Sequence, residues 1–275
     1  MLPQQDPLLV PLIEAALAGA RAVMAVYRTD FAVERKADNS PVSEADRQAE
    51  AAILARLSEA LPDIPIVAEE AVGAGSAPRT GRRFLLVDPL DGTKEFVSRN
   101  GEFTVNVAFV EDAAPIAGVV LAPALGRAYA GSAAGAWAGK MAGGKICDWA
   151  PVRTRAAGRS PVAVASRSHS NEATEKALSK AGAGERRSIG SSLKFCLIAE
   201  AEADFYPRLG PTMEWDTAAG DAVLRAAGGR VVTLDGAPLS YGKIGVAGMR
   251  DYENPHFLAA GDPRLLDRLN LTKAA

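Results

Sequence analysis

The stretch that most constrains the fold of this chain is FLLVDPLDGTKEF, from Phe84 to Phe96. Its apolar start predicts a buried strand with Asp88 at the carboxyl end, where α/β sheets usually place their sites. Asp91 and Gly92 come next at a predicted helix start, whose free amides and positive dipole end face the same place. Neighbouring carboxylates repel, so an anion site beside them requires bridging cations. The stretch therefore predicts a phosphate site bridged by Mg²⁺.

The same residues have an ordinary structural interpretation, because Asp-Pro-Leu-Asp-Gly is common turn chemistry and an Asp often caps a helix. Other acids favour the functional interpretation. Glu69 follows the short apolar run 64–68, and Asp216 precedes a helix predicted over 217–227. Taken singly, Glu69 is also explained as a solvated strand end and Asp216 as a helix cap. Together they place further carboxylates at the edges of buried elements.

These motifs resemble the two signatures of the inositol monophosphatase superfamily of Mg²⁺-dependent, lithium-sensitive phosphatases. The match extends from about Lys36 to about Gly229 and is carried by Ala68-Glu-Glu70, Val87-Asp-Pro-Leu-Asp-Gly-Thr93 and Trp215-Asp-Thr-Ala-Ala-Gly220. Within the superfamily, the stretch Asn100-Gly-Glu-Phe-Thr-Val-Asn-Val-Ala108, with the stretch from Lys36 to Asp46, is most similar to CysQ-type 3′(2′),5′-bisphosphate nucleotidases. The resemblance implies an α+β, layered αβαβα sugar-phosphatase fold.

Two packed subdomains are expected, with the metals at their junction and a boundary inside 151–160. Residues 1–155 would form an N-terminal α+β subdomain with most metal ligands, and residues 156–275 a C-terminal α/β subdomain with Asp216 and the nucleoside-binding residues. Periodicity and turn residues predict the individual elements. These are helices over 6–27, 171–180, 193–201 and 262–269, strands over 31–36, 103–110, 115–121, 127–130, 161–165, 203–207 and 230–234, loops over 37–42 and 71–82, and a loop or hairpin over 139–149.

The resemblance also implies a metal site. One Mg²⁺ would be held by Glu69, Asp88 and the backbone carbonyl of Leu90, and a second by Asp88, Asp91 and Asp216. A third, weaker ion near Glu69 is an alternative. Oxygen ligands suit this hard cation, and a bridging Asp88 would keep two ions close enough to clamp an in-line displacement.

Asp46 and Thr93 are the implied catalytic pair, which activates the attacking water. The amides of Gly92 and Thr93 would bind phosphate oxygens at the helix start. Asp46 also has a structural interpretation, because the sequence from Ser43 to Asp46 reads like a capping box.

The resemblance implies a nucleotide substrate with two phosphates. The residues expected to bind it are Glu69, Leu90, Asp91, Gly92, Thr93, His169, Ser191, Lys194, Arg208 and Asp216, of which His169, Ser191, Lys194 and Arg208 would hold the nucleoside and its second phosphate. Any lone basic residue is also explained by surface solvation. The implied reaction converts adenosine 3′,5′-bisphosphate into AMP and phosphate, with 3′-phosphoadenylyl sulfate as a related substrate. Such an activity would support sulfate assimilation.

Two alternatives stay open. The same chemistry could act on inositol or another sugar monophosphate, although Lys194 and Arg208 favour a second anionic group. The chain could instead be a non-catalytic metal or phosphate sensor, yet every implied ligand is present. A Ser-His-Asp hydrolase fits poorly, because the chain has only two histidines and lacks a Gly-x-Ser-x-Gly elbow where one is needed.

Composition narrows the class of protein further. The chain has 275 residues, of which 48% are hydrophobic, and a net charge of −2, which argues against a broad nucleic-acid surface. Cys147 and Cys196 are far apart and predict neither a disulfide framework nor a thiolate metal site. The apolar start is interrupted by Pro11 and Glu14, so no signal peptide or integral membrane segment is expected. The expected location is the cytoplasm, with peripheral inner-membrane association and a monomer or homodimer left open.

Overall fold

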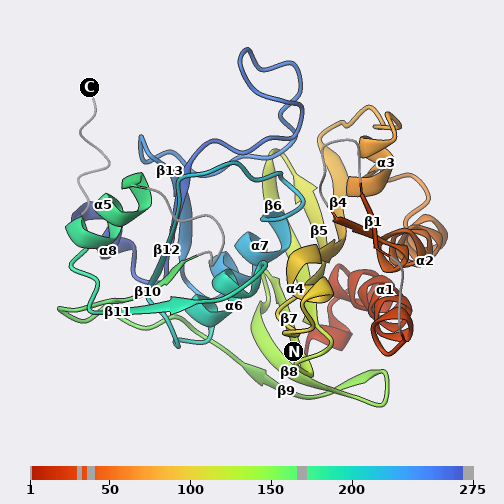
Figure 1. Ribbon diagram of the computed structural model, residues 1–275, viewed down its shortest axis with the longest axis horizontal. Helices are drawn as coiled ribbons and strands as arrows, with labels where there is room; N and C mark the ends of the chain where they lie inside the picture. Colours follow the sequence, from red (N-terminus) through yellow and green to blue (C-terminus); the bar gives the residue numbers. More distant parts are fainter. Residues whose placement is uncertain (1, 30–32, 36–40, 166–171, 269–275) are drawn as a thin grey trace.

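The structure, a computed structural model, describes residues 2–29, 33–35, 41–165 and 172–268. Its elements form five layers in the order helices, sheet, helices, sheet, helices (Figure 1). The predicted α+β fold with αβαβα layering is confirmed.

The first helical layer covers one face of the larger sheet. It consists of α1 (Leu9–Tyr27) and α2 (Glu44–Ala60), which pack on each other and on the sheet. The start of α1 follows the 3-10 turn η1 (Pro3–Gln5) and is held by Asp6, whose Oδ1 accepts the Leu8 N–H at 2.9 Å. The apolar face predicted for α1 is buried: Leu9, Leu12, Ile13 and Ala16.

The larger sheet has seven strands in the order β3-β4-β5-β6-β7-β8-β9. β3 is parallel to β4 and every other pair is antiparallel, which confirms the antiparallel strands predicted from residue 103 onward. The segment 139–149, predicted as a loop or a hairpin, belongs to the β8–β9 hairpin. The strands are β3 (Ile66–Ala68), β4 (Arg83–Asp91), β5 (Thr104–Glu111), β6 (Ala114–Ala122), β7 (Arg127–Ser132), β8 (Gly135–Ala142) and β9 (Lys145–Pro151).

Four short elements accompany α2 and the first two strands of this sheet. Helix α3 (Glu69–Gly73) directly follows β3, and α4 (Thr93–Val97) follows β4. The predicted strand over 31–36 is present as β1 (Val33–Arg35). The loop prediction for 37–42 is wrong at its end, because β2 (Pro41–Ser43) pairs antiparallel with β1. A cross-strand partner overrides the turn-forming composition there.

The middle helical layer separates the two sheets and consists of α6 (Leu193–Ala199) and α7 (Ala218–Ala226). α7 packs on the larger sheet through β5, β6 and β7, and α6 packs on α7. The close approach depends on glycine: a Cβ at Gly220 of α7 would lie 2.5 Å from the Phe195 ring of α6.

The smaller sheet has five strands in the order β11-β10-β12-β14-β13, covered on its outer side by two helices (Figure 1). The prediction missed β11, a polar segment, and β14. The predicted boundary at 155/156 lies between β9 and β10 and stays a prediction. The elements are α5 (Glu172–Lys180), α8 (Pro263–Arg268), β10 (Val162–Ala165), β11 (Glu185–Ser188), β12 (Phe205–Arg208), β13 (Arg230–Thr233) and β14 (Phe257–Ala260).

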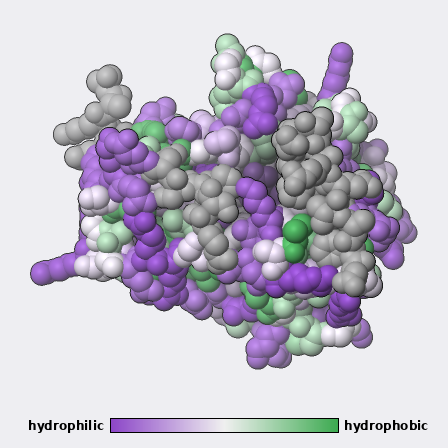
Figure 2. All heavy atoms as spheres, in the orientation of Figure 1, coloured by the Kyte–Doolittle hydropathy of each residue, from purple (hydrophilic) through white to green (hydrophobic). Residues whose placement is uncertain are grey.

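Within the described ranges, α1 is the one helix whose length and apolar composition would suffice to cross a membrane, and 56% of its most apolar window is buried inside the protein. A core helix meets the same two criteria. Figure 2 shows one face of the molecule, on which hydrophilic residues predominate and hydrophobic ones are scattered. The predicted absence of an integral membrane segment stays a prediction.

Candidate active site

The carboxyl end of β4 is irregular. Asp88 is 1% exposed and pairs with Asn106 of β5, and the register shifts between Asp88 and Asp91. The Asp88 Oδ1 accepts the Leu90 N–H at 3.0 Å, an Asx-type turn around Pro89. The strand therefore continues to Asp91 across a bulge, and the bulge sets the spacing of the two acids.

Gly92 links this strand to α4 with a φ of +92°, in the left-handed region that favours glycine. A Cβ at this position would also lie 3.3 Å from the Glu102 carbonyl oxygen and the Phe103 Cα. The hydroxyl of Thr93, the first helical residue, lies 3.5 Å from the Leu90 carbonyl oxygen. The predicted anion-binding turn is thus built on a glycine that no other residue would replace without strain.

The structure brings the predicted acids together from four elements. Asp88 comes from β4, and its pKa is raised well above the usual range of a carboxyl, above all by burial. Four further carboxylates raise it, in the order Glu69 of α3, Asp91 of β4, Asp216 before α7 and Asp46 of α2.

Asp216 lies at the approach to α7 and closes the cluster from the side of the smaller sheet. Its Oδ2 accepts the Met213 N–H at 2.9 Å. Burial raises its pKa well above the usual range, and Asp91 and Glu69 add to the shift. Burial also raises the pKa of Asp91, but there Lys194 and a backbone hydrogen bond from Ser192 act in the opposite direction.

The donor set fits a hard cation. In the part of the chain that the structure describes, no three His, Cys, Asp or Glu side chains are grouped as a preassembled coordination sphere. The cluster is nevertheless composed of oxygen donors, and the neighbouring acids make Asp88 and Asp216 harder to ionise. A bound divalent cation would relieve this repulsion, and oxygen-only ligands are those that Mg²⁺ prefers.

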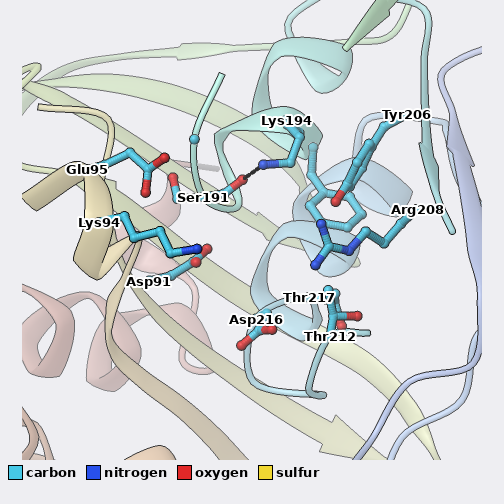
Figure 3. Close-up of a pocket in the computed structure, with 13 residues that line it drawn as sticks. Asp91, Lys94, Glu95, Ser191, Lys194, Tyr206, Arg208, Thr212, Asp216 and Thr217 are labelled. Carbon is cyan, nitrogen blue, oxygen red and sulfur yellow. Dashed lines mark hydrogen bonds between the residues drawn. The ribbon is translucent and has the colours of Figure 1, made fainter. Parts of the chain in front are cut away.

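A pocket of about 100 Å³ adjoins the acids. Figure 3 shows Lys194 and Arg208 on one side of it and Asp91 and Asp216 on the other. The acids and two of the predicted phosphate-binding cations thus share one cavity. Its lining is Asp91, Gly92, Lys94, Glu95, Gly190, Ser191, Lys194, Phe195, Tyr206, Arg208, Thr212, Asp216 and Thr217.

Lys194 is 6% exposed, and its ammonium donates to the carbonyl oxygens of Ser191 at 2.6 Å and Ile189 at 3.2 Å (Figure 3). Two of its three N–H groups are therefore engaged. Burial lowers its pKa to about 8, against the influence of Asp91. Ser191 has a φ of +50°, which non-glycine residues rarely adopt. Lys194 thus holds the loop before α6 as well as facing the pocket.

Arg208 ends β12 and is 9% exposed. One terminal nitrogen donates to the Pro211 carbonyl oxygen at 2.6 Å, while the buried Nε has no hydrogen-bond partner in the described part of the chain. Leaving a buried charged donor unsatisfied costs about 1–3 kcal/mol or more. A positive side chain with an unused donor, placed beside this pocket, suits an anionic ligand.

The sequence analysis did not predict some of the residues that line the pocket. Lys94, Glu95, Tyr206, Thr212 and Thr217 line the pocket without having been predicted. Lys94 and Glu95 belonged to the quoted motif and carried that signal, whereas the others come from elements that only the tertiary structure places here. His169 lies outside the described residues, as does Lys36.

Glu214, two residues before Asp216, has a structural task. It is fully buried and accepts the N–H groups of Gly242 at 2.5 Å and Lys243 at 2.9 Å, and the Lys243 ammonium at 2.6 Å. The Tyr252 carbonyl oxygen in turn accepts the Glu214 N–H at 2.8 Å. Both ends of the loop between residues 242 and 252 are therefore fixed to the segment that carries Asp216.

The chain belongs to the inositol monophosphatase family, whose model matches residues 4–268. Among similar proteins, the 3′(2′),5′-bisphosphate nucleotidase CysQ of Shigella flexneri is 46% identical over 222 residues, which cover 80% of this chain and 88% of that protein. The protein of the same name from Escherichia coli K12 is 45% identical with the same coverage.

Solved structures agree with this assignment. CysQ from Bacteroides thetaiotaomicron, described as a bacterial member of the inositol monophosphatase family, is 38% identical with a TM-score of 0.75, over 92% of this chain and 96% of that one. An inositol monophosphatase from Anabaena has a TM-score of 0.72 at 22% identity, over 96% of this chain and 94% of that one. At that identity the likeness shows the fold alone.

Proposed function

We propose that this chain is a Mg²⁺-dependent 3′(2′),5′-bisphosphate nucleotidase, which hydrolyses the 3′-phosphate of adenosine 3′,5′-bisphosphate to give AMP and phosphate. The observation that carries the proposal is the pocket in which the acid cluster faces Lys194 and Arg208. A monophosphate would offer no second phosphate group to Lys194 and Arg208. The similarity to CysQ proteins over most of the chain supports the same substrate class.

In the proposed site, Glu69, Asp88 and the Leu90 carbonyl would hold one Mg²⁺, and Asp88, Asp91 and Asp216 a second. When bound, the ions supply positive charge to the phosphoryl oxygens and to the departing oxygen. The burial that raises the pKa of Asp88 keeps water from screening this charge. A third ion near Glu69 remains an alternative.

The protein's own groups would position the reactants. The amides of Gly92 and Thr93 would hold phosphate oxygens, because the first N–H groups of a helix such as α4 have no partner within the helix. The Thr93 hydroxyl and Asp46 would orient the attacking water and take up its proton. The new P–O bond then forms in line with the breaking bond to the ribose 3′-oxygen, which leaves with a proton from solvent.

The second phosphate would lie between Lys194 and Arg208. Counting only the described residues, Lys194 has one N–H and Arg208 its Nε without a partner, so both can donate to phosphate oxygens without breaking the hydrogen bonds described above. Ser191 and His169 are further proposed contacts of the nucleoside. 3′-Phosphoadenylyl sulfate carries the same 3′-phosphate and is a proposed second substrate.

The test measures phosphate release with Mg²⁺ from adenosine 3′,5′-bisphosphate and from inositol 1-phosphate at equal concentrations, with and without Li⁺. We expect a strong preference for the nucleotide and inhibition by Li⁺. Preference for inositol phosphate would retain the metal chemistry and overturn the substrate assignment. No release from either substrate would favour a sensor. The cytoplasmic location, the role in sulfate assimilation and the oligomeric state stay predictions.

A further inference from the structure

Three buried polar residues form a hydrogen-bonded chain behind the acid cluster. The Ser192 hydroxyl donates to the Asn106 Oδ1 at 2.7 Å and lies 2.9 Å from the Thr104 hydroxyl. Since the single Ser192 proton goes to Asn106, Thr104 is the donor in the second bond. The three residues are 0%, 1% and 2% exposed for Thr104, Asn106 and Ser192. The direction of the whole chain is therefore fixed, from Thr104 through Ser192 to Asn106.

Strand register places this chain of hydrogen bonds next to two proposed metal ligands. Thr104 is the cross-strand partner of Asp91, and Asn106 is the cross-strand partner of Asp88. Paired residues in an antiparallel sheet point to the same face, with Cβ atoms about 5 Å apart. The Ser192 backbone in addition lies close enough to the Asp91 carboxylate to favour its charged form. Both acids thus have a neighbour in the Thr104–Ser192–Asn106 chain.

Ser192 stands at the N-cap position of α6, where a serine side chain would ordinarily accept a helix N–H. It makes no such capping bond. Its hydroxyl is used toward β5 instead, so the residue has another task than starting the helix.

The Asn106 side chain, which accepts the Ser192 hydrogen bond, lies next to Asp88. Its Oδ1 is occupied by Ser192, so its amide group is directed away from Ser192, and the buried Nδ2 has no hydrogen-bond partner among the residues that the structure describes. A buried unsatisfied donor is costly unless a ligand-bound state uses it. Asp88, the cross-strand neighbour, is the acid that the proposed function assigns to both ions.

We propose that Ser192 and Asn106 are positioning residues for the metal ligands, a role that rests on the proposed function. Ser192 orients the Asn106 amide, whose Nδ2 would donate to a carboxylate oxygen of Asp88 when the metal site is occupied, and its backbone lies beside Asp91. Hydrogen bonds to ligating carboxylates fix their orientation and tune metal affinity. Because Ser192 immediately precedes α6, the same residue ties the acids to the helix that carries Lys194.

The test uses Ser192→Ala, Asn106→Leu and the double variant, with Ser132→Ala as matched control. Ser132 is another buried serine whose hydroxyl donates to a side-chain oxygen, in its case that of Asp6, but it lies on β7. Isothermal titration with MgCl₂ in the absence of substrate gives the Mg²⁺ dissociation constant, and thermal unfolding in EDTA reports the fold. We expect each single variant to raise the dissociation constant about tenfold or more, and Ser132→Ala to leave it unchanged.

The double variant shows whether Ser192 and Asn106 affect Mg²⁺ binding together or independently. If Ser192 acts on Asp88 through Asn106, the double variant will lose less than the sum of the two single losses in binding free energy. Mg²⁺ binding within twofold of the unaltered chain in both single variants would overturn the proposal, whatever their thermal stability. Failure of the proposed function would be seen separately, as an unaltered chain that neither binds Mg²⁺ nor releases phosphate.

Discussion

Gly118 of β6 and Gly131 of β7 lie opposite each other in the larger sheet, and α7 rests directly on both. A Cβ at Gly118 would lie 2.6 Å from the Ala219 carbonyl oxygen, and one at Gly131 2.6 Å from the Val223 Cα. Because these are backbone atoms of a helix that α6 contacts from the other side, the helix has little room to yield. The glycine pair therefore sets the depth at which α7, with Asp216 before it, approaches the sheet.

Gly118→Ala should accordingly destabilise the fold and displace Asp216. We expect a loss of about 1–3 kcal/mol in the free energy of unfolding, as for other overpacked cores, together with reduced phosphate release. Urea unfolding and the phosphate assay check both effects. Gly158→Ala is the control, since a Cβ there meets nothing within 4 Å. Identical unfolding midpoints for the two variants would contradict this account of helix depth.

Asp88→Asn should abolish turnover while stabilising the metal-free protein. The substitution removes one buried charge from a cluster in which burial and four neighbouring acids already raise the pKa of this carboxyl. Losing a group that only supports a metal ligand typically lowers activity by about 10- to 100-fold. Losing Asp88, a ligand that both ions share, should therefore lower phosphate release by more than about 100-fold. Thermal unfolding in EDTA should shift to higher temperature.

Asp63→Asn, at an exposed position away from the cluster, serves as the control for the loss of one carboxylate. Near-normal Mg²⁺-dependent turnover of the Asp88 variant would refute its assignment to the metals. A lower unfolding temperature in EDTA would show that the cluster is stabilised in some other way than by a bound cation.

Arg208→Met should affect the nucleotide far more than a simple monophosphate. A charge-assisted hydrogen bond is worth about 1.5–3 kcal/mol, so the ratio of kcat/KM between the two substrates should fall roughly 10- to 100-fold. Lys194→Met should lower the ratio too, but with some loss for both substrates, because Lys194 also holds the carbonyls of Ile189 and Ser191. Lys140→Met, at an exposed lysine of β8, is the control. Equal losses with both substrates in the Arg208 variant would reject its contact with the second phosphate.

Asp262 predicts a pH dependence of stability. It precedes α8, where its carboxylate accepts the Arg264 and Ala157 N–H groups at 3.0 and 3.1 Å. A hydrogen bond from the Arg264 side chain lowers the pKa of Asp262 from 3.8 to about 2. A lowered carboxyl pKa stabilises the fold above the unfolded value of 3.8, and this contribution disappears as the pH falls toward 2.

Asp262→Ala should therefore cost about 1 kcal/mol near neutral pH, the usual value of a helix cap, and progressively less below about pH 4. Chemical denaturation at a series of pH values gives the difference, with Asp63→Ala as the exposed control. A difference that stays constant down to about pH 3 would show that the side chain acts through packing and not through its charge.

The local parts of the site were predictable from the sequence because they are encoded within a few residues. The buried strand that begins near Phe84, the turn at Gly92 and the helix start at Thr93 all follow from adjacent residue types, and the structure has each of them. The predicted strand end at Asp88 is wrong, because β4 continues across a bulge to Asp91. The layered fold was predictable through the family resemblance, whereas periodicity alone indicated only mixed α and β elements.

The rest depends on contacts between distant segments, which no local pattern records. β11 was missed because Glu185–Ser188 is a polar strand at the edge of the smaller sheet, where pairing with β10 decides its conformation. Likewise, the sequence around Lys194 does not indicate that its ammonium donates two hydrogen bonds to carbonyl groups of the preceding loop. Nor does it indicate that the Ser192 hydroxyl donates to Asn106 of β5.

The loop that Glu214 holds at both ends, residues 242–252, is a suitable insertion site for a tag or a reporter. Its tip carries the exposed residues Ile244 and Val246 and the glycines Gly245 and Gly248, while its two ends are held by hydrogen bonds to Glu214. Exposed loop tips with anchored ends tolerate insertions well. A short peptide tag or a fluorescent reporter inserted between residues 245 and 248 would lie outside the hydrogen bonds to Glu214. The backbone conformation of the segment that carries Glu214 and Asp216 should therefore be unchanged.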